Sequence, residues 1–426
     1  MARTRSAKKA TRGKSSLQNE RSDPDLDLIS NLPVDAYNAI LMCLPLRDAV
    51  RTSILSRKWR YRWASIPHLV FDGIKRCAID LADIVNGVLL VHNGPVHKFV
   101  CSYYVKAPYH LDQWILFLSK NGIKQLTLGF LQHSYRVHSR LFSCQAPSDL
   151  HLTGCKINPP PAFEGFRGLR NLYLQRVCIA NDELERLILK CPLLETLTLK
   201  NCYSRLIHFV INALNLRHLC LSGEFKDLQI TNSPLLITAA IDLTRNIYGA
   251  EHLEQGGVCN LIKILGSLHH IEKLELQGYL LEFFSMGNVP DVLPTSFLHL
   301  KNLSMGICFN DRKVVLTALC MLRSSPNLEM LEFSVCGYGI LEFQVIPNAG
   351  FWEAQEHLGC LLNHLRTVKM TGIMGDECEL CFIRFLLANA PVLETMSTGK
   401  IVKKSRFLKD MLQLRRASTQ AIIICD

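Results

Sequence analysis

A group of cysteine and histidine residues near the C-terminal end has the types and spacing that could bind a metal. Cys360 and His364 lie four positions apart, and Cys378 and Cys381 follow as a C-x-x-C pair. Thiolate and imidazole are preferred zinc ligands, so a zinc site would form if all four converged. The spacing of residues 360–365 also fits one face of a packed helix, and the C-x-x-C pair lies inside an apolar helical pattern. We therefore predict a structural role with no metal and no cofactor, and keep an enzyme built on this group as the alternative.

Other sequence motifs of catalysis are absent from the chain. It contains no phosphate-binding glycine loop, no nucleophile elbow and no H-E-x-x-H motif. Its 15 histidines show no spacing that suggests a general base or a ligand site. We predict that the protein has no catalytic residues and is not an enzyme.

The stretch LSRKWRYRW, residues 55–63, combines cationic and aromatic side chains that could bind nucleic acid. Proteins that bind single strands hold aromatic rings inside the basic groove, so that bases stack while phosphates are neutralised. Here the large apolar residues recur at intervals of four, four and three, which places them on one face of a helix. These residues are Leu55, Trp59, Trp63 and Ile66. The basic residues cover the rest of the helix and are Arg57, Lys58, Arg60 and Arg62. The pattern predicts a buried tryptophan seam with a solvated basic rim.

Positive charge is concentrated at the N-terminus. The formal net charge is +11, and residues 1–21 contribute +6 of it, through seven Arg and Lys residues against Glu20 alone. The other 405 residues share +5, which disfavours nucleic acid as a partner of the main body. Residues 1–27 hold scarcely any large apolar side chain, so we expect a disordered basic tail. That tail is either a nuclear-import signal or a merely solvated segment.

Cysteine usage and hydropathy indicate an intracellular chain. The 17 cysteines are an odd, scattered set with no signal-peptide hydrophobic region ahead of them, which favours reduced thiols. No apolar run approaches the roughly 18 to 20 residues of a membrane helix. We expect a soluble protein of the nucleus, the cytoplasm or both, without a membrane partner.

Short helices bounded by prolines are predicted over residues 28–67. Pro33 suits the first turn of a helix, and apolar residues follow at helical spacing until Pro45 ends the pattern. A second helix is predicted to begin near Leu46, and a third to span residues 57–66. This segment therefore reads as a small three-helix module.

Short Leu-x-Leu strands dominate the rest of the chain. They begin at Leu126, Leu150, Leu172, Leu197, Leu219, Leu274, Leu303, Leu331 and Val368. The first five begin 24, 22, 25 and 22 residues apart, within the period of roughly 20 to 29 residues typical of leucine-rich repeats. A second motif, proline and leucine separated by one residue, precedes a strand four times, over residues 191–199, 233–241, 325–333 and 390–398. Both signals predict an α/β leucine-rich-repeat solenoid.

The segments between these strands are predicted to return through helices. Asn181 could cap such a helix, with Leu184, Leu187 and Ile188 facing the core. The spacing widens to 35 residues from Ala239 to Leu274 and to 37 from Leu331 to Val368, which indicates inserted helices or loops.

The middle residue of each Leu-x-Leu strand should face away from the core, on the concave surface of a solenoid. The predicted target-contacting residues are Tyr173, Thr198, Cys220, Glu275, Ser304, Glu332 and Lys369. The alternative is that some are ordinary solvated strand positions.

Residues 28–71 resemble the F-box, the module by which substrate receptors dock on the Skp-type adaptor of cullin/RING ubiquitin ligases. The matching motifs are Leu-Pro at 32–33, Ile-Leu at 40–41, Leu-Pro at 44–45 and the run TSILSRKWRYRW at 52–63. Val34 departs from the family pattern, which favours an acidic residue, and Ala36 from its larger aliphatic residue. The resemblance implies the adaptor-binding residues Leu32, Pro33, Ile40, Leu44, Pro45, Leu55, Ser56, Trp59 and Trp63.

Residues 357–396 are similar to the FBD region that follows the repeats in plant F-box/leucine-rich-repeat proteins. The similarity lies in a Cys-Leu opening, a Leu-x-x-Val-x-Met strand, a glycine and acidic turn, and a Leu-Leu-x-Asn-Ala-x-x-Leu-Glu close. The expected organisation is a basic tail (1–27), an F-box (28–71), leucine-rich repeats (72–345) and an FBD region continuing the solenoid (346–420).

This organisation implies a non-catalytic substrate receptor of a ubiquitin ligase. Its partners would be a Skp-type adaptor, through it a cullin and a RING protein, and a target protein that the sequence does not identify. The alternatives are an F-box/LRR interaction protein acting outside a cullin ligase and a nucleic-acid-binding protein using the basic tail.

Overall fold

The computed structural model describes residues 32–72, 80–102, 108–130, 135–202, 208–225, 227–244, 261–268, 270–285, 289–335, 346–356, 362–399, 401 and 404–425. The chain divides into two compact units, Met1–Trp63 and Ala64–Asp426. The predicted disordered tail and Cys360 lie outside the described residues. Disorder and nuclear import of the tail therefore stay predictions.

Two prolines set the boundaries of the helices in the first unit. Helix α1 (Val34–Cys43) begins after Pro33, where a missing backbone N–H costs little. Leu44 is extended, as the ring of a following proline favours, and this ends α1. Helix α2 (Leu46–Arg51) then begins after Pro45 and continues into the 3-10 turn η1 (Thr52–Ile54). Both helices and their proline boundaries are as the sequence predicts.

The third predicted helix, residues 57–66, is not α-helical. Residues 57–61 form turns, and only a short 3-10 turn, η2 (Arg62–Ser65), follows. Arg62 Nε donates to the carbonyl of Lys58 (3.0 Å), and Ser53 Oγ donates to that of Arg60 (2.8 Å). The backbone amides of Trp59 and Arg62 donate to the carbonyls three residues earlier, those of Ser56 (3.2 Å) and Trp59 (3.3 Å), as in turns, and not four residues earlier as in an α-helix. The three-helix form of the module is therefore corrected to two α-helices and a turn segment.

The predicted apolar stripe of this segment is correct only in part. Trp59 and Trp63 are buried, and so is Ile66. Leu55 instead has 58% of its surface exposed. Without a continuous helix, the spacing of four residues no longer places Leu55 on the face of the tryptophans.

A single parallel sheet runs through the described parts of the second unit and contains fourteen strands. The strands, in the order in which they pair, are β1 (His68–Val70), β2 (Lys98–Cys101), β3 (Gln125–Gly129), β4 (Asp149–Thr153), β5 (Asn171–Gln175), β6 (Thr196–Lys200), β8 (His218–Gly223), β10 (Thr238–Leu243), β11 (Lys273–Gly278), β12 (Asn302–Ile307), β13 (Met330–Val335), β14 (Thr367–Thr371), β15 (Thr395–Thr398) and β16 (Ile422–Cys425). Adjacent strands are consecutive along the chain except around β7 and β9, the order expected of a repeat solenoid.

The leucines of the repeats lie in register and form the core beneath the sheet. Leu126 pairs with Leu150 across β3 and β4, and Leu150 pairs with Leu172 across β4 and β5. The alignment continues through the remaining predicted strands to Val368, and all nine of these core residues are almost fully buried. The predicted solenoid strands are thereby confirmed.

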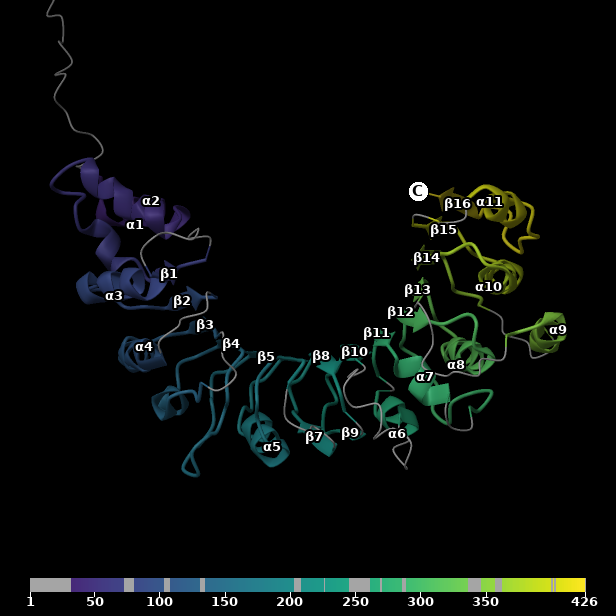
Figure 1. Cartoon of the computed structure of the whole chain (residues 1–426), viewed down its shortest axis with the longest axis horizontal. Helices are drawn as coiled ribbons and strands as arrows, with labels where there is room; N and C mark the ends of the chain where they lie inside the picture. Colours follow the sequence, from purple (N-terminus) through teal and green to yellow (C-terminus); the bar gives the residue numbers. More distant parts are fainter. Residues whose placement is uncertain are drawn as a thin grey trace, which may run out of the picture. The chain divides into compact units, whose positions relative to one another are not determined.

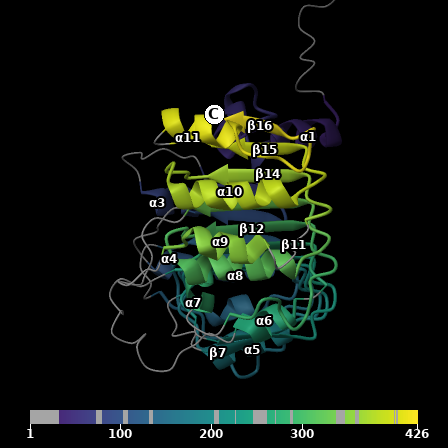
Figure 2. The ribbon, with the colours of Figure 1, turned by 90° about the vertical axis from the view of Figure 1, so that its right-hand side faces the viewer.

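Helices form a layer over one face of the sheet and leave the other face open (Figure 1). They are α3 (Leu81–Val91), α4 (Pro108–Lys120), η3 (Ser139–Ser143), α5 (Asn181–Leu189), α6 (Leu261–Gly266), α7 (Leu280–Ser285), α8 (Arg312–Arg323), α9 (Ala349–Glu356), α10 (Glu377–Asn389) and α11 (Lys404–Leu412). Figure 2 shows α8, α10 and α11 stacked in chain order across the strands. Helix α5 confirms the predicted return helix, but Asn181 is its first residue and Ala180 is the cap.

The widely spaced repeats contain additional elements. The unit between β10 and β11 includes α6, and the unit between β13 and β14 includes α9, as inserted helices would require. A separate two-stranded parallel sheet pairs β7 (His208–Asn212) with β9 (Asp227–Thr231). The sequence motifs gave no indication of this second sheet, nor of β1, β2 and β16.

In the described part of the chain, every helix is too short or too polar to cross a membrane.

Candidate functional site

An aromatic and cationic stack lies inside the first unit. The buried Trp59 meets the ring of Tyr37 edge-on, with ring centres 6.3 Å apart. The guanidinium carbon of Arg62 lies 3.7 Å from the centre of the same Tyr37 ring. The stack ties α1 to the turn segment after α2. It also corrects the predicted basic rim, because Arg62 packs on an aromatic ring while Arg57, Lys58 and Arg60 are exposed.

The predicted adaptor-binding residues fall into two groups in the structure. Trp59 and Trp63 are buried, so within this chain they stabilise the fold and offer little surface to a partner. The others are half-buried or exposed and are Leu32, Pro33, Ile40, Leu44, Pro45, Leu55 and Ser56. The structure thus leaves the second group available for contact.

The first unit exposes several large apolar side chains. Among its described residues, this exposed apolar set consists of Val34, Ile40, Met42, Ile54, Leu55 and Tyr61. Ile54 is the most exposed, at 86% of its surface. A contiguous patch of such side chains marks a protein-binding surface, and Ile54 and Leu55 are consecutive members of this set. Val34, Met42, Ile54 and Tyr61 were not among the predicted residues, because helical spacing alone does not show which apolar face of a short module is covered.

The predicted target-contacting residues lie in one row on the open face of the sheet. Cross-strand pairing aligns the middle residues of the strands from β3 to β15. This open-face row is Thr127, His151, Tyr173, Thr198, Cys220, Ala240, Glu275, Ser304, Glu332, Lys369 and Ser397. It contains all seven predicted positions and four further ones. Thr127 and His151 follow from the Leu-x-Leu motifs at Leu126 and Leu150, which are themselves a sufficient signal.

The first half of the row is uncharged and carries an aromatic pair. The rings of His151 and Tyr173 have centres 5.2 Å apart and planes at 35°. Burial lowers the pKa of His151 below its ordinary value, and Asp149 nearby opposes that shift. The imidazole is therefore mainly neutral at neutral pH.

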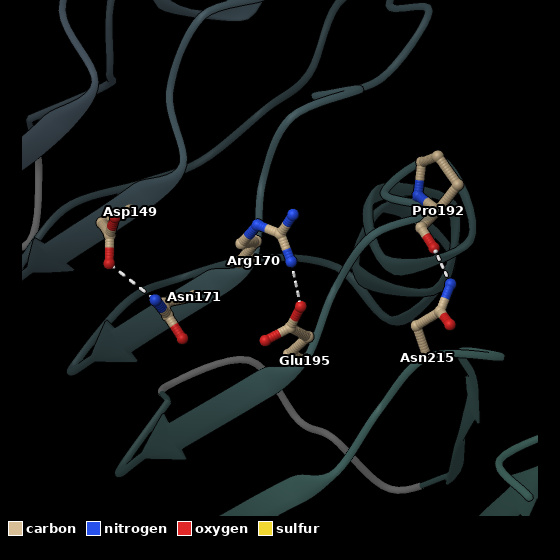
Figure 3. A network of polar contacts seen from close by, with 6 residues as sticks. All are labelled: Asp149, Arg170, Asn171, Pro192, Glu195 and Asn215. Atoms are coloured by element: carbon tan, nitrogen blue, oxygen red, sulfur yellow. Dashed lines mark hydrogen bonds and ion pairs between the residues drawn. The ribbon is translucent and has the colours of Figure 1, made fainter. Parts of the chain in front are cut away.

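Polar groups where strands β4 to β8 begin bond to one another (Figure 3). Asp149 accepts hydrogen bonds from Asn171 Nδ2 (2.6 Å) and from Ser148 Oγ (2.6 Å). Further along the same edge, Asn215 Nδ2 donates to the carbonyl of Pro192 (2.8 Å), which ties one repeat to the next.

The middle of the row surrounds Cys220 with charged groups. Burial raises the pKa of the Cys220 thiol, Lys200 opposes that rise, and Glu275 and Asp242 add to it. At neutral pH the thiol is protonated, and only the thiolate is a strong nucleophile. This position therefore offers a contact surface and no activated nucleophile.

The second half of the row is charged. Lys273 and Glu275 form an ion pair at 2.7 Å. Gln277 bridges two strands, because its Nε2 donates to Ser304 Oγ (2.9 Å) and its Oε1 accepts from Ser334 Oγ (3.1 Å). Glu332 and Lys369 are exposed neighbours on β13 and β14. The two halves of the open face thus differ in chemistry.

Charged residues alternate in sign where the strands begin. This charge ladder is Arg170, Glu195, Arg217, Glu272, Lys301, Glu329, Arg366 and Glu394. Its members are joined in order by backbone hydrogen bonds of 2.8 to 2.9 Å, with Ile237 inserted between Arg217 and Glu272. Arg170 pairs with Glu195 (Figure 3), and Arg366 pairs with Glu394 at 2.6 Å. Opposite charges on adjacent strands favour this stacking order over one that skips a repeat.

Relatives among the curated proteins span nearly the whole chain. An F-box/FBD/LRR-repeat protein of Arabidopsis thaliana, At1g13570, is 37% identical over 412 residues, which cover 93% of this chain and 98% of that protein. The chain belongs to the F-box/FBD/LRR-repeat family. Two more Arabidopsis proteins, the F-box/FBD/LRR-repeat protein At5g56420 and the FBD-associated F-box protein At5g56370, are each 24% identical over 94% of this chain and 99% and 100% of their own lengths.

Family models match three parts of this F-box/FBD/LRR-repeat protein. The F-box domain matches residues 29–70, and the FBD matches residues 356–397. The LRR repeats of the FBD-associated F-box protein At5g56370 match residues 111–333. These matches confirm the resemblances drawn from the F-box and FBD motifs, and they place the exposed apolar set within the F-box and most of the open-face row within the repeats.

The FBD contains a turn held by a buried carboxylate. Glu379 is buried in the first turn of α10, and its two oxygens accept the amides of Met374 (3.0 Å), Gly375 (2.7 Å) and Asp376 (3.0 Å). Gly375 has a φ of 89°, a conformation that favours glycine. The glycine and acidic turn of the FBD motif therefore has a structural purpose, which is to join β14 to α10.

The cysteine and histidine group does not form a metal site among the described residues. Cys378 and Cys381 lie on α10, as predicted, and His364 lies in the turn before β14 instead of on the predicted helix. Across the described ranges, no three Cys, His, Asp or Glu side chains are placed to hold a metal ion. Burial raises the pKa of the Cys378 thiol to about 11, so in the absence of a metal ion this thiol is protonated at neutral pH.

Proposed function

We propose that this F-box/FBD/LRR-repeat protein is the non-catalytic substrate receptor of a Skp–cullin–F-box ubiquitin ligase. The observation that carries the proposal is the exposed apolar set inside the F-box match. Its members include Ile40 and Leu55, which the family resemblance assigns to adaptor binding. Burying such side chains against a partner stabilises a complex by about 1.5 to 3 kcal/mol each when burial is complete.

The proposed mechanism is proximity. The F-box holds the chain on a Skp-type adaptor, and a cullin and a RING protein bind through that adaptor. The open-face row holds a target protein, so that transfer of ubiquitin to a target lysine occurs within one assembly. No side chain of this protein takes part in the chemistry. Residence in the nucleus, the cytoplasm or both stays a prediction.

Reconstitution from purified components tests this proposal. The full chain is mixed with a plant Skp-type adaptor, a cullin and a RING protein, then supplied with ubiquitin and its activating and carrier enzymes. We expect one co-eluting assembly and ubiquitylation of the chain's own lysines, with both lost when the adaptor is omitted.

Matched variants locate the docking surface. Leu55→Asp in the F-box should abolish assembly, because it places a charge in the apolar contact. Leu90→Asp is the control, since Leu90 is equally a leucine and is 86% exposed on α3 of the second unit. A chain that binds the adaptor but never recruits the cullin would contradict the ligase role and indicate an F-box protein acting outside a cullin ligase.

A further inference from the structure

The His151–Tyr173 pair is the one place on the described open-face row where two aromatic rings are adjacent. Cross-strand pairing sets Thr127 on one side of the pair and Thr198 on the other. Threonine side chains are shorter than either ring, so the rings extend further from the sheet than their neighbours. The Tyr173 hydroxyl donates to Gln175 Oε1 (3.2 Å), which fixes the ring along its strand.

Among the described residues near this pair, the charged side chains where strands β4 to β6 begin are partnered. Asp149 is bound by Asn171 and Ser148, and Arg170 and Glu195 neutralise each other where the strands begin. Lys200, the last residue of β6, shares the open face with Thr198 by strand alternation. Tyrosine gives rigid contact area and asparagine adaptable hydrogen bonding, and both residue types are enriched in antibody binding loops.

We propose that the His151–Tyr173 pair anchors the bound segment of the target by stacking on one uncharged aromatic or aliphatic side chain. This inference rests on the proposed function, because it assumes that the repeats hold a protein. A charged side chain placed here would lose hydration without gaining a counter-charge, so it is disfavoured. An aromatic side chain can stack on both rings at little cost in conformational entropy. Charged target residues are better suited to Glu332 and Lys369, at the other end of the row.

Selection from a phage-displayed library of random peptides on the immobilised full-length chain tests the proposal. The selected pool should be enriched in Trp, Phe, Tyr or Leu at one position. Tyr173→Ala should weaken binding of a selected peptide by roughly tenfold or more, as loss of an aromatic hot spot does. Tyr173→Phe, which keeps the ring, should retain most of the binding, and Glu332→Ala on the same row should change it little.

Three outcomes would overturn the inference. The first is a pool of selected peptides dominated by Asp, Glu, Lys or Arg. The second is a pool with the same composition as the peptides selected on the support without protein. The third is selected aromatic peptides that still bind both the His151→Ala and the Tyr173→Ala variant. Thermal unfolding of each variant confirms that it is folded. Adaptor binding is measured on the same preparations, so a chain that binds adaptor but shows one of these outcomes loses only this inference. A chain that binds aromatic peptides through Tyr173 but binds no adaptor loses the ligase proposal instead.

Discussion

The guanidinium of Arg62 packs on the ring of Tyr37, with 3.7 Å between the guanidinium carbon and the ring centre. Arg62 follows α2, whereas Tyr37 lies in α1, so the contact closes the F-box module on itself. Trp59 contacts the same ring in a T-shaped arrangement, with ring centres 6.3 Å apart. A residue that the sequence placed on a basic rim therefore contributes to the packing of the module, because a guanidinium is weakly hydrated and stacks on aromatic faces.

Tyr37→Ala should destabilise the F-box by about 1 to 3 kcal/mol, because it removes the ring that both Trp59 and Arg62 contact. Hydrogen exchange of the backbone amides in residues 34–63 measures this directly, and those amides should exchange faster than in the parent chain. Tyr61→Ala is the control, since Tyr61 is 66% exposed in the same module. Equal exchange rates in the two variants would show that the stack does not hold the module together.

Reversing one charge in the charge ladder should destabilise the solenoid. Glu329→Lys places a third positive charge between Lys301 and Arg366, and repulsion across adjacent strands should lower the free energy of unfolding by about 0.5 to 1 kcal/mol at low salt. Urea unfolding measures the change.

Salt separates this effect from a loss of packing. At about 1 M NaCl, where screening acts over about 3 Å, the difference between Glu329→Lys and the parent should largely vanish. Glu353→Lys, an exposed reversal on α9 away from the ladder, is the matched control. If Glu329→Lys lowers the free energy of unfolding by the same amount at low and high salt, the alternation of charge has no energetic role.

Removing the buried carboxylate of the FBD turn should loosen the C-terminal repeats. Glu379→Gln leaves one acceptor oxygen for three backbone amides and adds an amide with no acceptor, so we expect a loss of about 1 to 3 kcal/mol. Glu377 lies two residues before Glu379 and is exposed, so Glu377→Gln should leave the stability nearly unchanged. Limited proteolysis between β14 and α10 gives the comparison, and equal cleavage of the two variants would refute the anchoring role of Glu379.

Buried thiols should make the solenoid sensitive to alkaline pH. Burial raises the pKa values of Cys144, Cys191 and Cys320 from the ordinary value near 9 to about 11. Above pH 9 the unfolded chain loses these protons while the folded chain keeps them, so stability is full below pH 9 and falls as pH rises toward 11. Urea midpoints measured across that range give the slope of stability against pH. Cys191→Ala/Cys320→Ala should make this slope shallower, and an unchanged slope would show that other groups are responsible.

The repeat architecture was predictable because its signal is redundant. Each Leu-x-Leu motif specifies a buried pair and one outward residue, and a row of such motifs at a nearly constant period also specifies which residues become neighbours. Tyr173 and Thr198 could thus be placed on one face from the sequence alone. The close approach of the His151 and Tyr173 rings, with 5.2 Å between their centres, could not be predicted, because it depends on side-chain orientation and not on period.

The errors have a common physical cause. Residues 57–66 carry a helical period, yet the amides of Trp59 and Arg62 donate to carbonyls three residues earlier instead of four. The strands β7 and β9 carry no Leu-x-Leu motif and pair outside the main sheet. In both places the hydrogen bonding departs from the local sequence pattern, and a single sequence does not reveal it. The exposure of Ile54 and Met42 was missed for the same reason, since spacing does not distinguish a covered apolar face from one that awaits a partner.

Calorimetric titration of the purified full-length chain with a plant Skp-type adaptor tests the central claim most directly. The parent should bind with one-to-one stoichiometry. Ile54→Ala/Leu55→Ala should raise the dissociation constant by roughly tenfold or more, because two apolar contacts are removed. Leu90→Ala should bind like the parent. A folded parent that gives no binding, or an Ile54→Ala/Leu55→Ala variant that binds as tightly as the parent, would contradict the account.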